Sequence, residues 1–228
     1  MTHTTTVPSY ERLVDVPIGR VSLEGNLIVP PGAQAVVLFA HGSGSSRFSP
    51  RNRFVAEALN EAGLATLLLD LLTGDEETID AHTRHLRFDI ELLADRLVGA
   101  TDWLCQEPET KGLSVGYFGA STGGGAALVA AARRPQAVAA VVSRGGRPDL
   151  AGAALAEVRA PTLLVVGGED VPVIELNQVA FAQLGTAEKQ LVLVPGATHL
   201  FEEPGALEDV ARLATDWFLI NLRRPVSA

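Results

Sequence analysis

Cysteine, basic residues and long apolar runs are all scarce in this sequence, and each shortage excludes a class of protein. A single cysteine, Cys105, rules out an internal disulfide and fits a reducing compartment. It ends the apolar stretch 103–105, so we expect a small buried side chain rather than a reactive thiol. Lysine and arginine number 18 against 27 aspartate and glutamate, which gives a net charge of −9. Such an acidic chain argues against a nucleic-acid or anionic-membrane surface and favours a small-molecule partner.

Signals for export or membrane insertion are also missing. Residues 1–6 have no basic start followed by an apolar run, and no stretch approaches the length of an apolar membrane span. We therefore expect a cytoplasmic protein. The 228 residues, 47% of them hydrophobic, fit one domain over 1–228 with a sizeable core, and they leave open whether the chain forms a homodimer.

Apolar runs bounded by turn residues recur along the chain and predict buried strands. The runs are 35–40, 64–69, 115–119, 137–142, 162–166 and 191–194. Two earlier runs, 13–18 and 21–29, flank Gly19-Arg20 and predict a hairpin. Helical spacing is found at 53–62, 86–104, 150–157 and 173–184, in an Ala-rich segment after Ser121, and after Pro204 up to about Arg223-Arg224. The acidic segment 73–80 is expected to be a solvated loop. The alternation predicts an α/β fold with a mostly parallel, eight-stranded, doubly wound sheet, an N-terminal antiparallel hairpin and helices on both faces.

The run at 115–119 leads into Gly119-Ala120-Ser121-Thr122-Gly123, a Gly-x-Ser-x-Gly motif at a strand-to-helix turn. Such a turn holds its serine in strained backbone angles, and it needs residues without side chains two positions before and after. A dinucleotide-binding turn fits less well, since Gly-x-Gly-x-x-Gly spacing is absent, and a phosphate loop ending in Gly-Lys-Ser/Thr is absent too. We therefore interpret Ser121 as a nucleophile.

A serine nucleophile needs a base, and a histidine base needs a carboxylate that fixes its tautomer. A carboxylate, Glu169 or Asp170, follows the strand at 162–166, and His199 follows the strand at 191–194. The order Ser, Asp, His, with each member directly after an apolar strand, predicts a catalytic triad at the carboxyl ends of the strands.

The chain resembles an α/β-hydrolase of the compact, lidless kind found in the dienelactone hydrolase family. The resemblance rests on the elbow at Ser121, on Gly167-x-x-Asp170 and Gly196-Ala197-Thr198-His199, and on His41-Gly42-Ser43-Gly44 after the strand at 35–40. It favours Asp170 over Glu169 as the acid. It also implies that the backbone N–H groups of Ser43 and Thr122 form an oxyanion hole, and that His41 is structural. Dienelactone hydrolases proper use a cysteine nucleophile, whereas this elbow carries serine, so ester hydrolysis is implied without the dienelactone specificity.

Arginines near the strand ends suggest how a substrate could be oriented. Arg144 and Arg147 leave the strand at 137–142, and either guanidinium could bind an anionic group of the substrate. The alternative is a surface loop whose arginines pair with Asp149 or with the acidic segment. Arg47, Arg51 and Arg53 admit the same two interpretations.

His82 and His85 resemble a sparse metal pair, but they lack nearby cysteines and a third clear ligand. A solvated helix start is the better interpretation, and we expect neither a metal nor a cofactor.

Together these features predict a serine hydrolase that cleaves small soluble carboxylic esters or thioesters through Ser121, His199 and Asp170. Two alternatives stay open. One is acyl transfer or perhydrolysis at the same triad, and the other is a non-catalytic ligand-binding protein that kept the fold.

Overall fold

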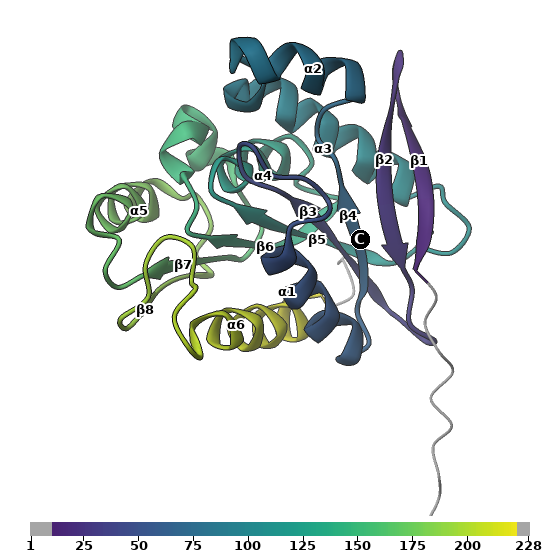
Figure 1. Ribbon diagram of the computed structural model, residues 1–228. Helices are drawn as coiled ribbons and strands as arrows, with labels where there is room; N and C mark the ends of the chain where they lie inside the picture. The colour runs from purple at the N-terminus through teal and green to yellow at the C-terminus, as the bar shows by residue number, and fades with distance from the viewer. Residues whose placement is uncertain (1–10, 223–228) are drawn as a thin grey trace, which may run out of the picture.

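The computed structural model describes residues 11–222, which form one twisted eight-stranded sheet with helices against both faces (Figure 1). The strand order is β1-β2-β4-β3-β5-β6-β7-β8. The strands are β1 (Arg12–Ile18), β2 (Val21–Ile28), β3 (Ala35–Ala40), β4 (Ala65–Leu69), β5 (Ser114–Ala120), β6 (Val138–Arg144), β7 (Thr162–Gly167) and β8 (Lys189–Val194). The pairs β1–β2 and β2–β4 are antiparallel, and all other neighbours are parallel. The predicted fold class is confirmed.

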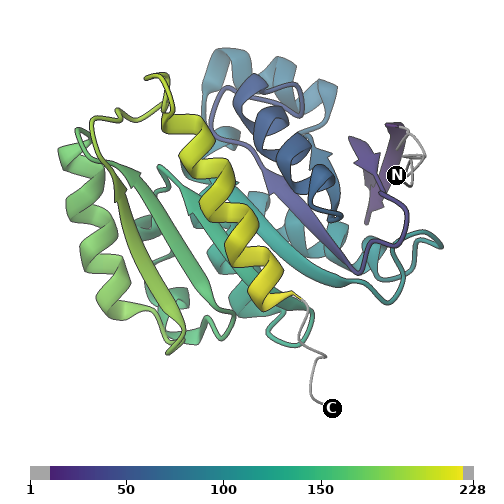
Figure 2. The ribbon, with the colours of Figure 1, turned by 90° about the horizontal axis from the view of Figure 1, so that it is seen from below.

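The continuous apolar runs have a simple cause, because each central strand is covered on both faces. Helices α1 (Pro50–Glu61) and α6 (Ala206–Asn221) pack on one face, and Figure 2 views the molecule from that side. Helices α3 (Ile90–Leu104), α4 (Thr122–Arg133) and α5 (Val171–Gln183) contribute to the core of the other face. Along β3, Val37 and Phe39 face the first core, whereas Val36 and Leu38 face the second. The strand ends that carry the polar motifs are thereby fixed from both sides.

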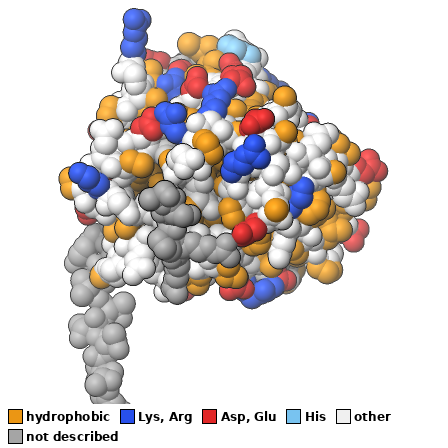
Figure 3. All heavy atoms as spheres, turned by 180° about the vertical axis from the view of Figure 1, so that it is seen from behind, with side chains coloured by type: hydrophobic (Ala, Val, Ile, Leu, Met, Phe, Trp, Pro, Cys, Tyr) orange, Lys and Arg blue, Asp and Glu red, His pale blue; other side chains and the backbone are white. Residues whose placement is uncertain are grey.

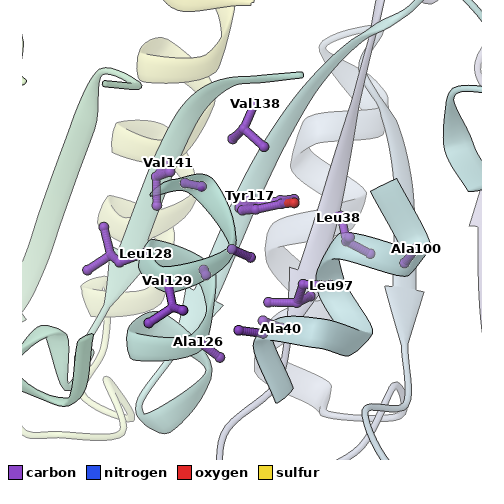
Figure 4. Close-up of a cluster of buried hydrophobic side chains, with 14 of the residues drawn as sticks. Leu38, Ala40, Leu97, Ala100, Tyr117, Ala126, Leu128, Val129, Val138 and Val141 are labelled. Carbon is purple, nitrogen blue, oxygen red and sulfur yellow. The ribbon is translucent and has the colours of Figure 1, made fainter. Parts of the chain in front are cut away.

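The core under the nucleophile turn is centred on Tyr117 of β5 (Figure 4). Its ring is fully buried with Leu38, Leu97 and Leu128 in one cluster that joins β3, α3 and α4 to β5. The phenol oxygen is hydrogen-bonded to the Thr101 hydroxyl, so the buried polar atom is satisfied. Burial raises the pKa of Tyr117, and the phenol stays neutral. Strand β5 is therefore anchored two residues before the elbow begins.

The acidic segment at 73–80, predicted to be a loop, lies mostly within a helix, α2 (Gly74–Thr83). Its start is a capping box. The Thr73 hydroxyl accepts the Glu76 N–H, and the Glu76 carboxylate accepts the Thr73 N–H. The pattern Thr-x-x-Glu was a helix signal that outweighed the charge-based prediction. His82 is in the last turn of α2 rather than at a helix start, whereas His85 directly precedes the 3₁₀ turn at 86–88. Both histidines are exposed, as predicted.

Other predicted boundaries shift by a few residues. The helix expected at 53–62 begins at Pro50, where the Ser49 hydroxyl caps the Asn52 N–H. The helix expected at 86–104 is split into a 3₁₀ turn, η1 (Leu86–Phe88), and α3, whose first turn is capped by Asp89. The segment expected at 150–157 is the 3₁₀ stretch η2 (Pro148–Glu157), with a kink at Gly152.

Three further expectations concern Cys105 and the two ends of the chain. Cys105 caps the end of α3 and is exposed, so the prediction of a buried side chain was wrong. The N-terminal residues 1–6 and the pair Arg223-Arg224 lie outside the described residues.

No helix within residues 11–222 combines the length and apolar character needed to cross a membrane. On the face shown in Figure 3, acidic and basic side chains are interspersed with apolar ones.

Candidate active site

Ser121 is at the sharp turn between β5 and α4 and has φ 51° and ψ −123°, an unfavourable conformation for a residue with a side chain. The glycines around it are required by contact. A Cβ on Gly119 would lie 2.6 Å from the Gly123 carbonyl oxygen, and a Cβ on Gly123 would lie 2.3 Å from the Ala40 carbonyl oxygen. The Ser121 N–H donates to the Arg144 carbonyl at 3.2 Å, which ties the turn to β6. The elbow geometry expected from the sequence is present.

His199 and Asp170 are joined although 29 residues separate them in the chain. The distance between His199 Nδ1 and Asp170 Oδ2 is 2.7 Å, and the Asp170 side chain is only 13% exposed. A carboxylate accepts only, so Nδ1 carries the proton and the neutral ring keeps Nε2 as a base. Asp170 precedes α5 but does not cap it with its side chain, which is engaged by the imidazole. The neighbouring Glu169 is exposed.

Ser121 and His199 line the same cavity, which has a volume of about 260 Å³. It opens at the carboxyl ends of the parallel strands, where ligands bind in open α/β sheets. The other lining residues are Gly42, Ser43, Ser45, Ser49, Arg51, Asn52, Ala120, Arg144 and Leu200. Within the described chain no hydrogen bond joins the Ser121 hydroxyl to the His199 ring, and such bonds often tighten only in the substrate complex.

The loop that carries His199 is braced by contacts that sequence reasoning missed. The Glu203 carboxylate accepts the Thr198 hydroxyl at 2.6 Å and the Thr198 N–H at 3.1 Å. The hydrogen bond from the Thr198 hydroxyl, followed by those from the backbone N–H groups of Glu203 and Thr198, lowers the pKa of Glu203, so this carboxylate stays ionised. On the other side, a Cβ on Gly145 would lie 3.2 Å from the His199 carbonyl oxygen. No periodic pattern links positions 198 and 203, so only the fold reveals this brace.

The His41 ring anchors the loop at 41–44 through contacts of both its ring nitrogens. The Leu71 N–H donates to His41 Nε2 at 3.1 Å, and Nδ1 lies 2.9 Å from the Gly42 carbonyl, so the ring is neutral with its proton on Nδ1. Burial lowers the pKa of His41, which keeps it uncharged. These contacts fit the expected structural role.

The two expected oxyanion donors differ in their present partners. Thr122 is the first residue of α4, so its N–H has no acceptor within the helix. The Ser43 N–H donates instead to the Thr122 hydroxyl at 2.8 Å. The two sides of the expected oxyanion hole are therefore joined directly, and a substrate oxygen would have to share or replace that bond.

The structure separates the two arginines that the sequence grouped together. Arg147 donates through Nε and Nη2 to both carboxylate oxygens of Asp149, at 2.8 and 2.7 Å, and does not line the cavity. Arg144 does line it and is buried, with 7% of its surface exposed. Arg51 lines it too and pairs with Glu202, whereas Arg47 is bound to Asp70 and Glu24.

Other places in the described residues offer less chemistry. No three His, Cys, Asp or Glu side chains within 11–222 gather so that they could hold a metal ion. A larger cavity, about 470 Å³, lies between α6 and the first residues of β7 and β8, at the opposite ends of those strands from His199. It contains none of the residues described above, so we place the candidate site in the smaller cavity.

Comparisons with known proteins bear on the family of the chain. The model of the Dienelactone hydrolase family matches residues 23–218. A dienelactone hydrolase structure from Anabaena variabilis ATCC 29413 is 67% identical with a TM-score of 0.93, and the match covers 94% of this chain and 99% of that one. Est1E from Butyrivibrio proteoclasticus, at 17% identity and TM-score 0.76 over 93% and 99% of the two chains, is similar in fold alone.

Two Mycobacterium tuberculosis proteins are 59% identical over 218 residues and bear the provisional name phosphoribosyl transferase. The match covers 96% of this chain but 48% of each relative, so the chain spans about half the length of these proteins. That name refers to the whole of each relative, of which only about half aligns with this chain.

Proposed function

The chain belongs to the dienelactone hydrolase family, and on that premise we propose that it is a serine hydrolase of small carboxylic esters or thioesters. The observation that carries the proposal is the bond between His199 Nδ1 and Asp170, which leaves Nε2 as a free base on a ring that lines the same cavity as Ser121. Strained backbone angles at Ser121 add support, because such strain persists where a side chain must be presented for function.

In the proposed mechanism the Ser121 oxygen attacks the ester carbonyl carbon while His199 Nε2 takes the hydroxyl proton. The imidazolium so formed is stabilised by Asp170. The negative oxygen of the tetrahedral intermediate accepts a hydrogen bond from the Thr122 N–H, typically worth about 3 kcal/mol. It accepts a second one from the Ser43 N–H, which for this must share or give up its bond to the Thr122 hydroxyl. His199 returns the proton to the leaving alkoxide or thiolate, and an acyl-enzyme remains. A water molecule, deprotonated by His199, then releases the carboxylic acid and restores the serine.

Two features set the limits of the substrate. The cavity of about 260 Å³ suits a small acyl or alcohol group rather than a long chain. The elbow carries serine where dienelactone hydrolases proper have cysteine. A serine still forms an acyl-enzyme and supports ester hydrolysis, and we propose no dienelactone specificity.

The direct test is Ser121→Ala with a short p-nitrophenyl ester. We expect turnover to fall to the uncatalysed rate while circular dichroism and Tm stay close to those of the wild type. Retained turnover would refute Ser121 as the nucleophile.

The same preparations distinguish the alternatives. A fluorophosphonate probe should label the wild type at Ser121, whereas a ligand-binding protein without catalysis should not react. Competing alcohols and hydrogen peroxide, added during turnover, should leave the free acid as the main product. A dominant transfer product would instead assign the site to acyl transfer or perhydrolysis.

A further inference from the structure

Thr122 places a buried hydroxyl group directly beside the nucleophile turn. It follows Ser121 as the first residue of α4, and only 3% of its surface is exposed. Its Oγ1 accepts the Ser43 N–H at 2.8 Å. Covalent geometry keeps the same oxygen close to the Thr122 N–H, since both belong to one residue. The hydroxyl is therefore flanked by the two N–H groups that are expected to bind the oxyanion.

The hydroxyl hydrogen of Thr122 has no acceptor within residues 11–222. Other buried threonines differ in this respect. Thr101, Thr110 and Thr162 each donate the hydroxyl hydrogen to a backbone carbonyl, at 2.8, 2.7 and 2.9 Å. Because buried polar groups are nearly always hydrogen-bonded, an unpaired donor next to a nucleophile points to an acceptor that arrives with the substrate.

The space next to this hydroxyl suits a single oxygen atom. Thr122 and Ser43 line a recess of about 10 Å³, which is about the room that one water-sized oxygen requires. Gly42 and Ser43 line both this recess and the cavity that contains Ser121. An oxygen atom of a substrate bound at Ser121 can therefore reach the recess.

Two carboxylates also line the recess, but neither of them accepts the Thr122 hydroxyl. Asp80 is 1% exposed, and its oxygens accept the Leu86 N–H and both the backbone and the side chain of Arg87. Glu77 is exposed. The hydrogen of the Thr122 hydroxyl is thus left available for a substrate.

The Ser43 N–H makes this hydroxyl a better donor. A hydroxyl that accepts a hydrogen bond is polarised and donates its own hydrogen more strongly. The group also sits at the N-terminus of α4, where the helix dipole favours a negative charge. Burial and the bond from Ser43 fix the hydroxyl before a substrate arrives, so little reorganisation is needed when charge develops.

We propose that the Thr122 hydroxyl is a further oxyanion donor, which keeps its bond from the Ser43 N–H and donates its own hydrogen to the negative oxygen of the tetrahedral intermediate. This inference rests on the proposed ester hydrolysis at Ser121. Thr122 then supplies two hydrogen bonds, one from its N–H and one from its hydroxyl, while the Ser43 N–H is shared. The opposite role is a hydroxyl that fills the oxyanion hole in the resting protein and must leave before the oxyanion forms.

Thr122→Val separates the two roles, because valine keeps the shape of the side chain but neither accepts nor donates a hydrogen bond. If the hydroxyl donates, kcat on a short p-nitrophenyl ester should fall about 10- to 100-fold with little change in KM, the range for a hydrogen bond to a charged group. Thr122→Ser should retain most of the activity, because it keeps the hydroxyl. An unchanged or higher kcat in Thr122→Val, or an equal loss in Thr122→Ser, would overturn the proposal.

Thr162→Val is the matched control. Thr162 is fully buried, and its hydroxyl donates to the Ala160 carbonyl at 2.9 Å at the start of β7, the end of the strand away from Asp170. This variant also removes a buried hydroxyl, so it reports the general effect of the substitution on the fold. We expect it to keep the wild-type kcat, and a loss as large as that of Thr122→Val would overturn the proposal.

A trifluoromethyl ketone with a ¹³C-labelled carbonyl carbon tests the contact with the oxyanion itself. Such a ketone adds Ser121 to form a tetrahedral hemiketal, and the ¹³C chemical shift reports whether the hemiketal oxygen is ionised. Because a hydrogen bond to the charged form favours ionisation, the hemiketal should ionise at a higher pH in Thr122→Val than in the wild type. The inhibition constant should rise by about the factor by which kcat/KM falls. Identical titration curves for the two proteins would contradict a contact between the hydroxyl and the oxyanion.

These measurements separate this inference from the proposed function. If the wild type hydrolyses no ester and the fluorophosphonate does not label Ser121, the proposed hydrolysis fails and this inference fails with it. If the wild type hydrolyses esters and loses activity in Ser121→Ala, but Thr122→Val is as active as the wild type, the role of the Thr122 hydroxyl fails alone.

Discussion

Replacing Asp170 by asparagine tests how the imidazole is made a base. The distance between His199 Nδ1 and Asp170 Oδ2 is 2.7 Å, which describes a short bond; the Asp170 side chain is 13% exposed and the His199 side chain 39%. Asparagine preserves the size of the side chain but not its charge. If its NH₂ faces Nδ1, the ring proton moves to Nε2 and the base is lost. If its oxygen faces Nδ1, the tautomer is kept but the imidazolium is no longer stabilised.

The expected loss follows from the role of the carboxylate. Removing the charge from a triad acid lowers kcat on the order of 10⁴-fold, which corresponds to about 5.5 kcal/mol of transition-state stabilisation. Because His199 is also held by a loop braced through Thr198 and Glu203, we expect the ring to stay in place and KM to change little. The assay is steady-state hydrolysis of a p-nitrophenyl ester at several pH values, with kcat and KM determined separately.

Glu169→Gln is the matched control, since it neutralises the neighbouring carboxylate, which is exposed. We expect it to keep kcat within about threefold of the wild type, as for an exposed side chain without a catalytic role. If Asp170→Asn keeps kcat within tenfold, or if Glu169→Gln shows the large loss, the assignment of the acid is refuted.

Two further variants test the packing and the charges of the fold. Gly123→Ala places a Cβ 2.3 Å from the Ala40 carbonyl oxygen, so we expect it to lower the free energy of unfolding by about 1–3 kcal/mol. Gly74→Ala is the control, because no atom lies within 4 Å of its new Cβ, and it should not lower that free energy. Equal denaturation midpoints for the two variants would contradict this prediction. Burial alone would raise the pKa of Asp80, but hydrogen bonds from Arg87 and from the Leu86 amide outweigh it and lower that pKa. Its stabilising effect is therefore complete above its unfolded pKa of about 3.9 and is lost as the pH falls through the lower folded value. Unfolding curves between pH 2 and 6 should show Asp80→Asn losing the most stability, relative to the wild type, at pH 6; a constant difference would contradict the assignment.

Sequence reasoning was strongest where burial dictates composition. A strand covered on both faces has to be apolar throughout, so β3, β5 and β7 are visible as uninterrupted runs, and the polar residues that follow them are visible by contrast. The elbow was equally readable, because backbone contacts at Gly119 and Gly123 leave no room for side chains. These two signals predicted the fold and placed Ser121, a carboxylate at 169 or 170, and His199 at strand ends, and the family resemblance favoured Asp170 as the acid.

Prediction failed where a side chain's partner, rather than its own type, decides its role. Helix α2 has little apolar content, and its acidic charge favoured a loop prediction although its capping box is a helix signal. Arg144 and Arg147 are three residues apart in one sequence segment, but one is enclosed beside Ser121 while the other reaches Asp149. The engagement of Ser43 N–H by the Thr122 hydroxyl joins residues 79 positions apart and has no local signature.

The most direct test of the account is to locate the acyl group during turnover. Wild-type protein mixed with excess p-nitrophenyl acetate, quenched in acid within the first turnovers and digested, should carry a single added acetyl group on Ser121 by mass spectrometry. Asp170→Asn should accumulate that adduct far more slowly, and Ser121→Ala should not form it. Acetylation at another residue, or turnover by the wild type with Ser121 unmodified under conditions where deacylation is slow, would contradict the assignment of Ser121 as a nucleophile activated by His199.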